Sequence, residues 1–95
     1  MAAYVIFCLQ DVADQAELQR YRMEGRGTLA AHGARFIAGS AIAETLEGPA
    51  LEGAVVLEFD NVEAARAWYH SPEYQAVIGI RLAATKGLAF IVDGR

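Results

Sequence analysis

Arg81 is the residue of this chain whose setting most strongly suggests chemistry. It falls on a stripe with the i, i+3, i+4, i+7 spacing of a buried helix face, whose other members are mainly apolar or aromatic: Tyr74, Val77, Ile78, Leu82 and Thr85. A guanidinium on an apolar face needs either a protein carboxylate or an anionic ligand. Two interpretations stay open. Arg81 forms an ion pair with Glu58 or Glu73, or it lines a cavity and holds a small carboxylate, enolate or phenolate through paired N–H groups.

Tyr74, Tyr21 and His32 are the other candidates for a ligand site. Tyr21 and His32 share the predicted inward stripe of an earlier helix, whose other members are Leu18, Arg22, Gly25 and Leu29. Residues of these types are also common in cores, where the polar tip finds a partner. His70 and His32 are the candidates for an acid or base, because imidazole titrates near neutral pH.

Ser71 is interpreted as a helix cap rather than a nucleophile, because no base and orienting group accompany it in the sequence. The single cysteine, Cys8, has no second cysteine or histidine cluster beside it, so the sequence predicts neither a disulfide nor a metal site. Nothing in the chain indicates haem or flavin binding, and we expect no cofactor.

The elements that position these side chains follow a β-α-β-β-α-β order. Strands are predicted at 3–9, 35–43, 53–59 and 88–92, with a bulge at Gly39-Ser40, and helices at 15–32, 62–69 and 72–86. Asp14 with Glu17 is typical of a capping box, and Gly33 and Gly87 are predicted helix stops. Ser71-Pro72 breaks the last helical region in two. Gly25 and Gly27 predict a kink or a close backbone approach in the first helix.

Composition indicates one domain over residues 1–95. The chain has 55% hydrophobic residues and a net charge of −4, with its charges scattered, so no surface for nucleic acid is expected. It has neither a leader sequence nor an apolar run long enough to span a membrane, and we expect a cytoplasmic protein.

The element order predicts an α+β, ferredoxin-like fold, with an antiparallel sheet and both helical regions on one face. The first, third and last strands are apolar on both faces. Because an antiparallel sheet with one face in water alternates apolar and polar residues, the second face is expected to pack against another copy of the sheet in a homodimer.

The chain also resembles a known family. The residues that carry the resemblance are the opening Ala3-Tyr4-Val5-Ile6, the run His32 to Phe36, the strand Val55 to Phe59, and above all Ala65 to Tyr74 followed by Arg81. They are similar to the domain-of-unknown-function family 1330 over essentially the whole chain, which implies a dimeric α+β barrel. Families of that fold include cofactor-free monooxygenases, lactone isomerases and haem-degrading enzymes, so the fold does not fix the chemistry. This chain has Gly39-Ser40-Ala41 where the family commonly carries Arg-Gly-Gly.

Two functions follow as hypotheses. The first is a homodimeric small-molecule-binding domain for a small anionic or aromatic ligand, extending to a cofactor-independent enzyme acting on a small organic acid or aromatic compound. The alternative is a structural or regulatory dimer with no ligand. A cavity lined by Arg81 with Tyr74, Tyr21 or His32 favours the first, and a filled core with Arg81 paired to a carboxylate favours the second.

Overall fold

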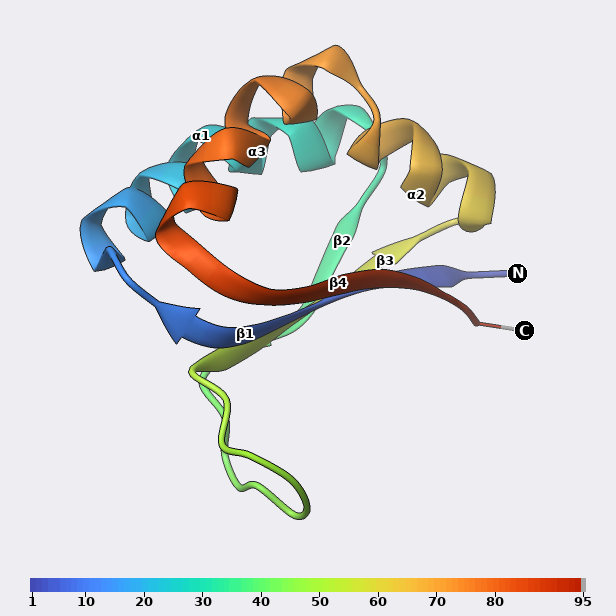
Figure 1. Cartoon of the computed structure of the whole chain (residues 1–95). Helices are drawn as coiled ribbons and strands as arrows, with labels where there is room; N and C mark the ends of the chain where they lie inside the picture. The colour runs from blue at the N-terminus through green and yellow to red at the C-terminus, as the bar shows by residue number, and fades with distance from the viewer. Residues whose placement is uncertain (95) are drawn as a thin grey trace.

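Across residues 1–94, which the computed structural model describes, three helices cover one face of a four-stranded antiparallel sheet (Figure 1). The elements are β1 (Ala3–Val12), α1 (Gln15–Ala31), β2 (Arg35–Ser40), β3 (Gly53–Phe59), α2 (Val62–Tyr69), α3 (Pro72–Ala84) and β4 (Thr85–Asp93). The strand order is β2-β3-β1-β4. The predicted α+β, ferredoxin-like arrangement with a broken second helix is confirmed.

The strands separate two sets of side chains. Residues directly opposite each other in an antiparallel pair share a face. Phe7 pairs with Val55, and both line the helix side of the sheet. Ile6 pairs with Val56 on β3 and with Phe90 on β4, which places all three on the opposite face. Each strand therefore contributes alternate residues to the interior and to a second, helix-free face.

The core is built around Trp68 at the end of α2. Its ring centroid lies 4.1 Å from that of Tyr74 and 5.5 Å from that of Phe59. All three side chains are almost completely buried. The broken helix thus packs onto the sheet through one aromatic cluster, which fixes where α3 begins.

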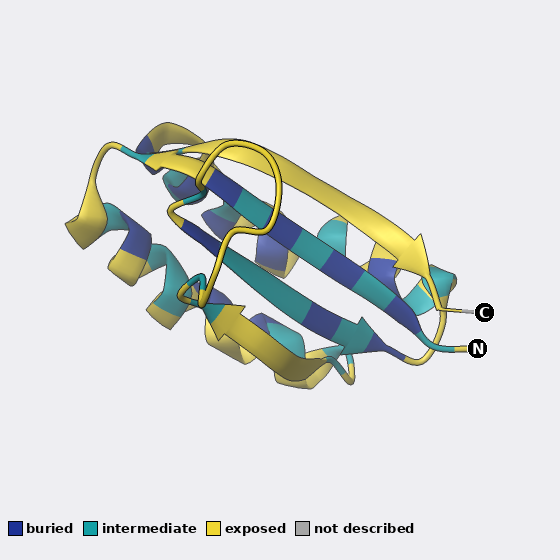
Figure 2. Cartoon of the chain, turned by 90° about the horizontal axis from the view of Figure 1, so that it is seen from below, coloured by how far each residue is buried: buried dark blue, intermediate teal, exposed yellow. Residues whose placement is uncertain are grey.

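No described helix covers the other face of the sheet, on which Ile6, Val56 and Phe90 lie side by side. Figure 2 shows this side, with buried and intermediate positions alternating along β1 and with β4 exposed along nearly its whole length. Leu88, Phe90 and Val92 of β4 are 56%, 43% and 40% exposed. The loop between β2 and β3 extends away from the sheet on this side (Figure 1).

The boundary between α3 and β4 corrects the sequence prediction. The helix ends at Ala84 rather than near Lys86, and Thr85 and Gly87 already belong to β4. The backbone of the C-cap residue Thr85 is already extended, and its hydroxyl donates to the Arg81 carbonyl at 2.8 Å. Gly87 is not a helix stop: a Cβ at this position would collide with the Cys8 carbonyl oxygen, so glycine lets β4 approach β1.

Other predicted details also change. β1 runs on to Val12, and β2 ends at Ser40 instead of residue 43. The register shift in β2 lies between Phe36 and Ala38, before the predicted bulge. α1 is continuous through both glycines: a Cβ on Gly25 would make ordinary contact with Val77 of α3, and one on Gly27 would meet nothing.

The predicted stripe on α3 is narrower than the sequence suggested. Tyr74, Val77 and Arg81 are buried, whereas Leu82 is 60% exposed. Leu82 directly follows the buried Arg81, and α3 packs mainly against α1, so the helix buries one narrow face and leaves the flank that carries Leu82 in solvent.

Candidate functional site

A cavity of about 540 Å³ lies between α1, α3 and the helix side of the sheet; we call it the Arg81 cavity. Its floor is apolar and comes from alternate residues of three strands: Phe7, Leu9, Phe36, Val55 and Leu57. Its walls carry Tyr21 from α1 and Tyr74 and Arg81 from α3. Phe36, which is 61% exposed, and the exposed Arg26 also line it, so it opens to solvent between α1 and β2.

Arg81 lies deep in this cavity and lacks the carboxylate partner that one interpretation required. It is only 8% exposed, and its Nε atom is buried with no hydrogen-bond partner among the described residues. The guanidinium carbon lies 4.9 Å from the ring centroid of Phe7 and 5.8 Å from that of Tyr21. These cation–π contacts favour the charge, but they leave the Nε–H unsatisfied.

The two carboxylates considered as partners of Arg81 bind elsewhere. Glu58 accepts from Arg35 at 2.8 Å and from the Tyr4 hydroxyl at 3.1 Å. Glu73 lies 3.3 Å from His32. Neither forms an ion pair with Arg81, and within residues 1–94 no aspartate or glutamate lines the cavity.

Tyr21 and Tyr74 form a hydrogen-bonded pair of phenols beside Arg81. Their hydroxyl oxygens are 2.6 Å apart. Burial, together with the adjacent Tyr74, raises the pKa of Tyr21 well above its usual value, so it is a neutral phenol at physiological pH. Burial lowers the pKa of Arg81, but the neighbouring Tyr74 and Tyr21 outweigh it, and the guanidinium stays charged. Only one hydroxyl donates within the pair, which leaves the other O–H available to a ligand.

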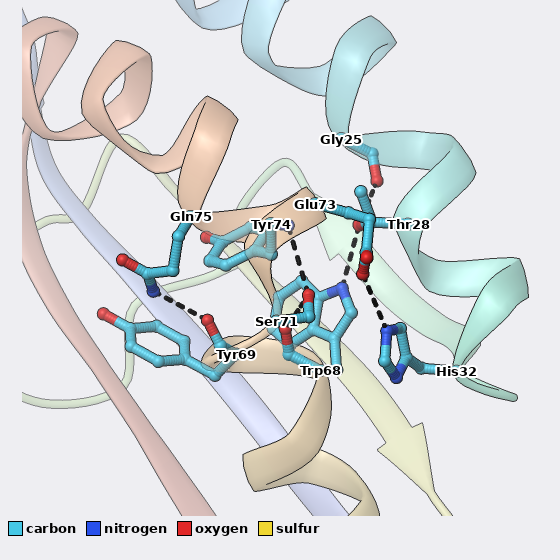
Figure 3. Close-up of polar contacts among 9 residues, drawn as sticks. All are labelled: Gly25, Thr28, His32, Trp68, Tyr69, Ser71, Glu73, Tyr74 and Gln75. Atoms are coloured by element: carbon cyan, nitrogen blue, oxygen red, sulfur yellow. Dashed lines mark hydrogen bonds and ion pairs between the residues drawn. The ribbon is translucent and has the colours of Figure 1, made fainter.

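Two hydrogen-bonded supports hold Tyr74 in place (Figure 3). The Ser71 hydroxyl accepts from the Tyr74 N–H at 3.2 Å and donates to the Trp68 carbonyl at 2.7 Å, as a buried helix cap. The Trp68 indole N–H donates to the Thr28 hydroxyl at 2.9 Å, and Thr28 donates to the Gly25 carbonyl at 2.6 Å. This chain ties α1 to α2 beneath the ring that packs on Trp68.

Of the site residues predicted from the sequence, three line the cavity and the two histidines do not. Arg81, Tyr74 and Tyr21 come together in the cavity. His32 does not line it: as the C-cap residue of α1 it lies beside Glu73 at the start of α3, so its predicted place with Arg81 is corrected. His70 is the exposed C-cap of α2, against the edge of the Tyr69 ring and also outside the cavity.

Sequence reasoning did not single out Thr28 or Arg26. Thr28 follows Tyr21 by seven residues and therefore lies on the same stripe of α1, a spacing that points to it. Arg26 follows Arg22 by four residues, and both line the cavity. Residues 1–94 contain no cluster of histidine, cysteine and carboxylate side chains that could hold a metal ion. No described helix is long and apolar enough to cross a membrane.

Comparisons with solved structures support the fold. A protein of unknown function from Rhodopseudomonas palustris is 13% identical, with a TM-score of 0.80 over 99% of this chain and 82% of its own. A dimeric ferredoxin-like protein of unknown function from Jannaschia is 17% identical, with a TM-score of 0.67 over 100% and 99%. SnoaB, a cofactor-independent oxygenase from Streptomyces nogalater, is 10% identical, with a TM-score of 0.60 over 99% and 92%.

No curated protein matches the chain. The family model described as "Domain of unknown function (DUF1330)" matches residues 2–95, nearly the entire sequence. The resemblance carried by the run from Ala65 to Tyr74 is thereby confirmed, and the chain belongs to the DUF1330 family.

Proposed function

We propose that this chain is a homodimeric domain that binds a small organic anion with an apolar body in the Arg81 cavity. The observation that carries the proposal is a charged guanidinium, 8% exposed, that has no carboxylate partner among the described residues and lines an open cavity beside the hydrogen-bonded hydroxyls of Tyr21 and Tyr74. An anion compensates the buried charge of Arg81, and the apolar floor accepts the remainder of the molecule. An ion pair of Arg81 with Glu58 or Glu73 in a filled core would have favoured the alternative of a ligand-free structural or regulatory module, and neither glutamate makes this pair.

The ligand atoms suited to the deep end of the cavity are carboxylate or enolate oxygens. Arg81 offers charge-assisted N–H donors, and one phenol of the Tyr21–Tyr74 pair offers an O–H. The floor residues Phe7, Leu57 and Val55 present only hydrocarbon, which suits an aromatic or aliphatic body. A bare inorganic anion would leave most of this apolar surface without contacts.

Thermal unfolding in the presence of a panel of small aromatic and aliphatic carboxylates tests the proposal. A ligand that binds only the folded chain raises the melting temperature in a concentration-dependent way. Arg81→Lys should weaken the shift, because a lysine lacks the planar fork, and Arg81→Gln should abolish it. Arg66→Gln, on the exposed side of α2, is the control and should keep the full shift. A panel that shifts nothing in the parent protein overturns the proposal.

Cofactor-independent catalysis is the second candidate, favoured because Arg81 and the hydrogen-bonded phenols of Tyr21 and Tyr74 line the same cavity. Donors fixed in this way stabilise an oxyanion that develops on a ligand. One solved structure of the same fold is a cofactor-independent oxygenase, which is compatible with this reading. Proton–deuterium exchange beside the carbonyl of a small keto acid, followed by NMR, tests it. If the protein binds the keto acid but its proton–deuterium exchange is no faster than in buffer, catalysis is rejected and the binding function stands.

A further inference from the structure

The Arg81 cavity carries more positive charge than one small carboxylate needs. Arg22 and Arg26 of α1 line it together with Arg81. Within residues 1–94 neither Arg22 nor Arg26 forms an ion pair. Three guanidinium groups without a carboxylate thus surround one apolar space, in a chain whose net charge is −4.

These arginines lie at two depths. Arg81 is buried, Arg22 is half-buried and Arg26 is exposed, so the α1 pair lies toward the opening and Arg81 toward the interior. Arg22 and Arg26 are one helical turn apart, a spacing at which two side chains reach a common group. A like-charged pair at this spacing is unfavourable by itself, so an anion between the two side chains would stabilise it.

The carboxylates of α1 do not neutralise this pair. Glu17 and Glu24 both bind Arg20, each at 2.9 Å, on exposed side chains. The helix therefore holds one arginine in a local ion-pair network and leaves the two that line the cavity without an acidic partner. The volume of about 540 Å³ also lies within the range of pockets that hold drug-sized ligands.

We propose that the ligand of the Arg81 cavity carries two acidic groups at opposite ends of an apolar body. One end is a carboxylate or enolate held by Arg81 and the phenol pair, and the other is a carboxylate held at the opening by Arg22 and Arg26. The inference rests on the proposed function and narrows its ligand class to rigid or extended dianions, such as aromatic dicarboxylates.

Naphthalene-2-carboxylate and naphthalene-2,6-dicarboxylate are the probes, because they share a skeleton and differ by one acidic group. Isothermal titration calorimetry of the parent chain should give a Kd for the dicarboxylate about tenfold lower than for the monocarboxylate. In the double variant Arg22→Gln/Arg26→Gln this ratio should fall to about one, because the second carboxylate loses its partners. Arg66→Gln should retain the parent's ratio. Raising the salt concentration should reduce the ratio in the parent, because the α1 arginines are partly exposed.

The outcomes separate this inference from the proposed function. If both naphthalene acids bind the parent equally, or if the tenfold ratio survives in the double variant, the two-ended ligand is wrong and single-anion binding stands. If small carboxylates bind but neither naphthalene acid does, the cavity does not accept a two-ended body and the inference fails. If no carboxylate binds at all, both proposals fall together.

Discussion

Thr28 shows, at the scale of one residue, how a buried hydroxyl serves two helices. It accepts from the Trp68 indole and donates to the Gly25 carbonyl, and it is 7% exposed. Trp68 packs on Tyr74, and Tyr74 lines the Arg81 cavity. By holding the Trp68 ring, the Thr28 hydroxyl therefore also helps to position the Tyr74 side chain in that cavity. A threonine in the middle of a helix would otherwise have little effect on the site.

Thr28→Val keeps the shape of the side chain and removes the acceptor. We expect a loss of about 1–3 kcal/mol in the free energy of unfolding, because the buried indole N–H is left without a partner. Urea unfolding followed by fluorescence of the single tryptophan measures it. Thr45→Val, in the exposed loop, is the matched control and should change stability by less than about 0.5 kcal/mol. Equal effects of the two substitutions would contradict the role given to Thr28.

Tyr21 predicts a pH dependence of stability. Its pKa is raised in the folded chain by burial and by Tyr74, so its contribution is fully present below the ordinary tyrosine pKa of about 10. Above that pH the unfolded chain releases the proton and the folded chain keeps it, so stability falls by up to about 1.4 kcal/mol per pH unit from this residue. Urea unfolding of the parent and of Tyr21→Phe between about pH 9 and 11 should show a shallower decline in the variant. Parallel declines would show that Tyr21 titrates normally.

At the scale of elements, the break between α2 and α3 sets the position of the site. Ser71 caps α3 and also bonds back to Trp68, whereas Pro72 supplies a preset first helical residue. Tyr74 and Arg81 then follow at an interval of seven residues and reach the same cavity. A different starting point for α3 would rotate both side chains away from Tyr21.

Ser71→Ala should lower the free energy of unfolding by about 0.5–2 kcal/mol. The loss should lie near the upper end of this range, because the removed hydroxyl is buried and makes two hydrogen bonds. Pro72→Ala should cost about 1 kcal/mol or less, since the cap remains. Asn61→Ala, which removes the exposed cap of α2, provides a comparison. Chemical denaturation ranks the three variants, and a Pro72→Ala effect larger than that of Ser71→Ala would reverse the assignment of roles.

Much of this arrangement could be predicted from helical spacing. The stripe on α3 placed Tyr74 and Arg81 together, and the stripe on α1 placed Tyr21 on an inward face. The partners of the acidic residues could not be predicted, because they depend on long-range register: Arg35 lies directly opposite Glu58 in the β2–β3 pair. His32 was misplaced because it is the C-cap residue beyond the end of α1, and its backbone no longer follows the helical repeat of the stripe. Arg26 could not be predicted from the apolar stripe of α1, because it is a charged, exposed residue that lies at the opening of the cavity.

At the scale of the whole molecule, the uncovered apolar face supports the proposed homodimer. Val56, Ile6 and Phe90 lie side by side on it, on three neighbouring strands. Contiguous apolar surfaces on soluble monomers rarely exceed a few hundred Å², whereas a standard interface buries about 800 Å² per partner.

Light scattering at micromolar concentration should give twice the mass of the 10.2 kDa chain. Val56→Lys places a charge at the centre of the uncovered face and should cause aggregation or unfolding, because the apolar sheet then lacks a cover. Leu82→Lys, on the exposed flank of α3, is the matched control and should leave the dimer intact. A monomeric parent protein, or an unaffected Val56→Lys dimer, would count against sheet-to-sheet association.

The alternation of side chains along the strands has a consequence for how this domain can be re-engineered. Phe7, Val55 and Leu57 belong to the cavity, whereas their chain neighbours Ile6 and Val56 belong to the opposite face. If the proposed ligand site and the proposed homodimer are both right, ligand preference and self-association are encoded at interleaved positions of the same strands, and either set can be varied while the other is held constant. A library randomised at the inward positions alone should yield chains that assemble alike and bind different ligands, which makes the scaffold a suitable starting point for designed receptors.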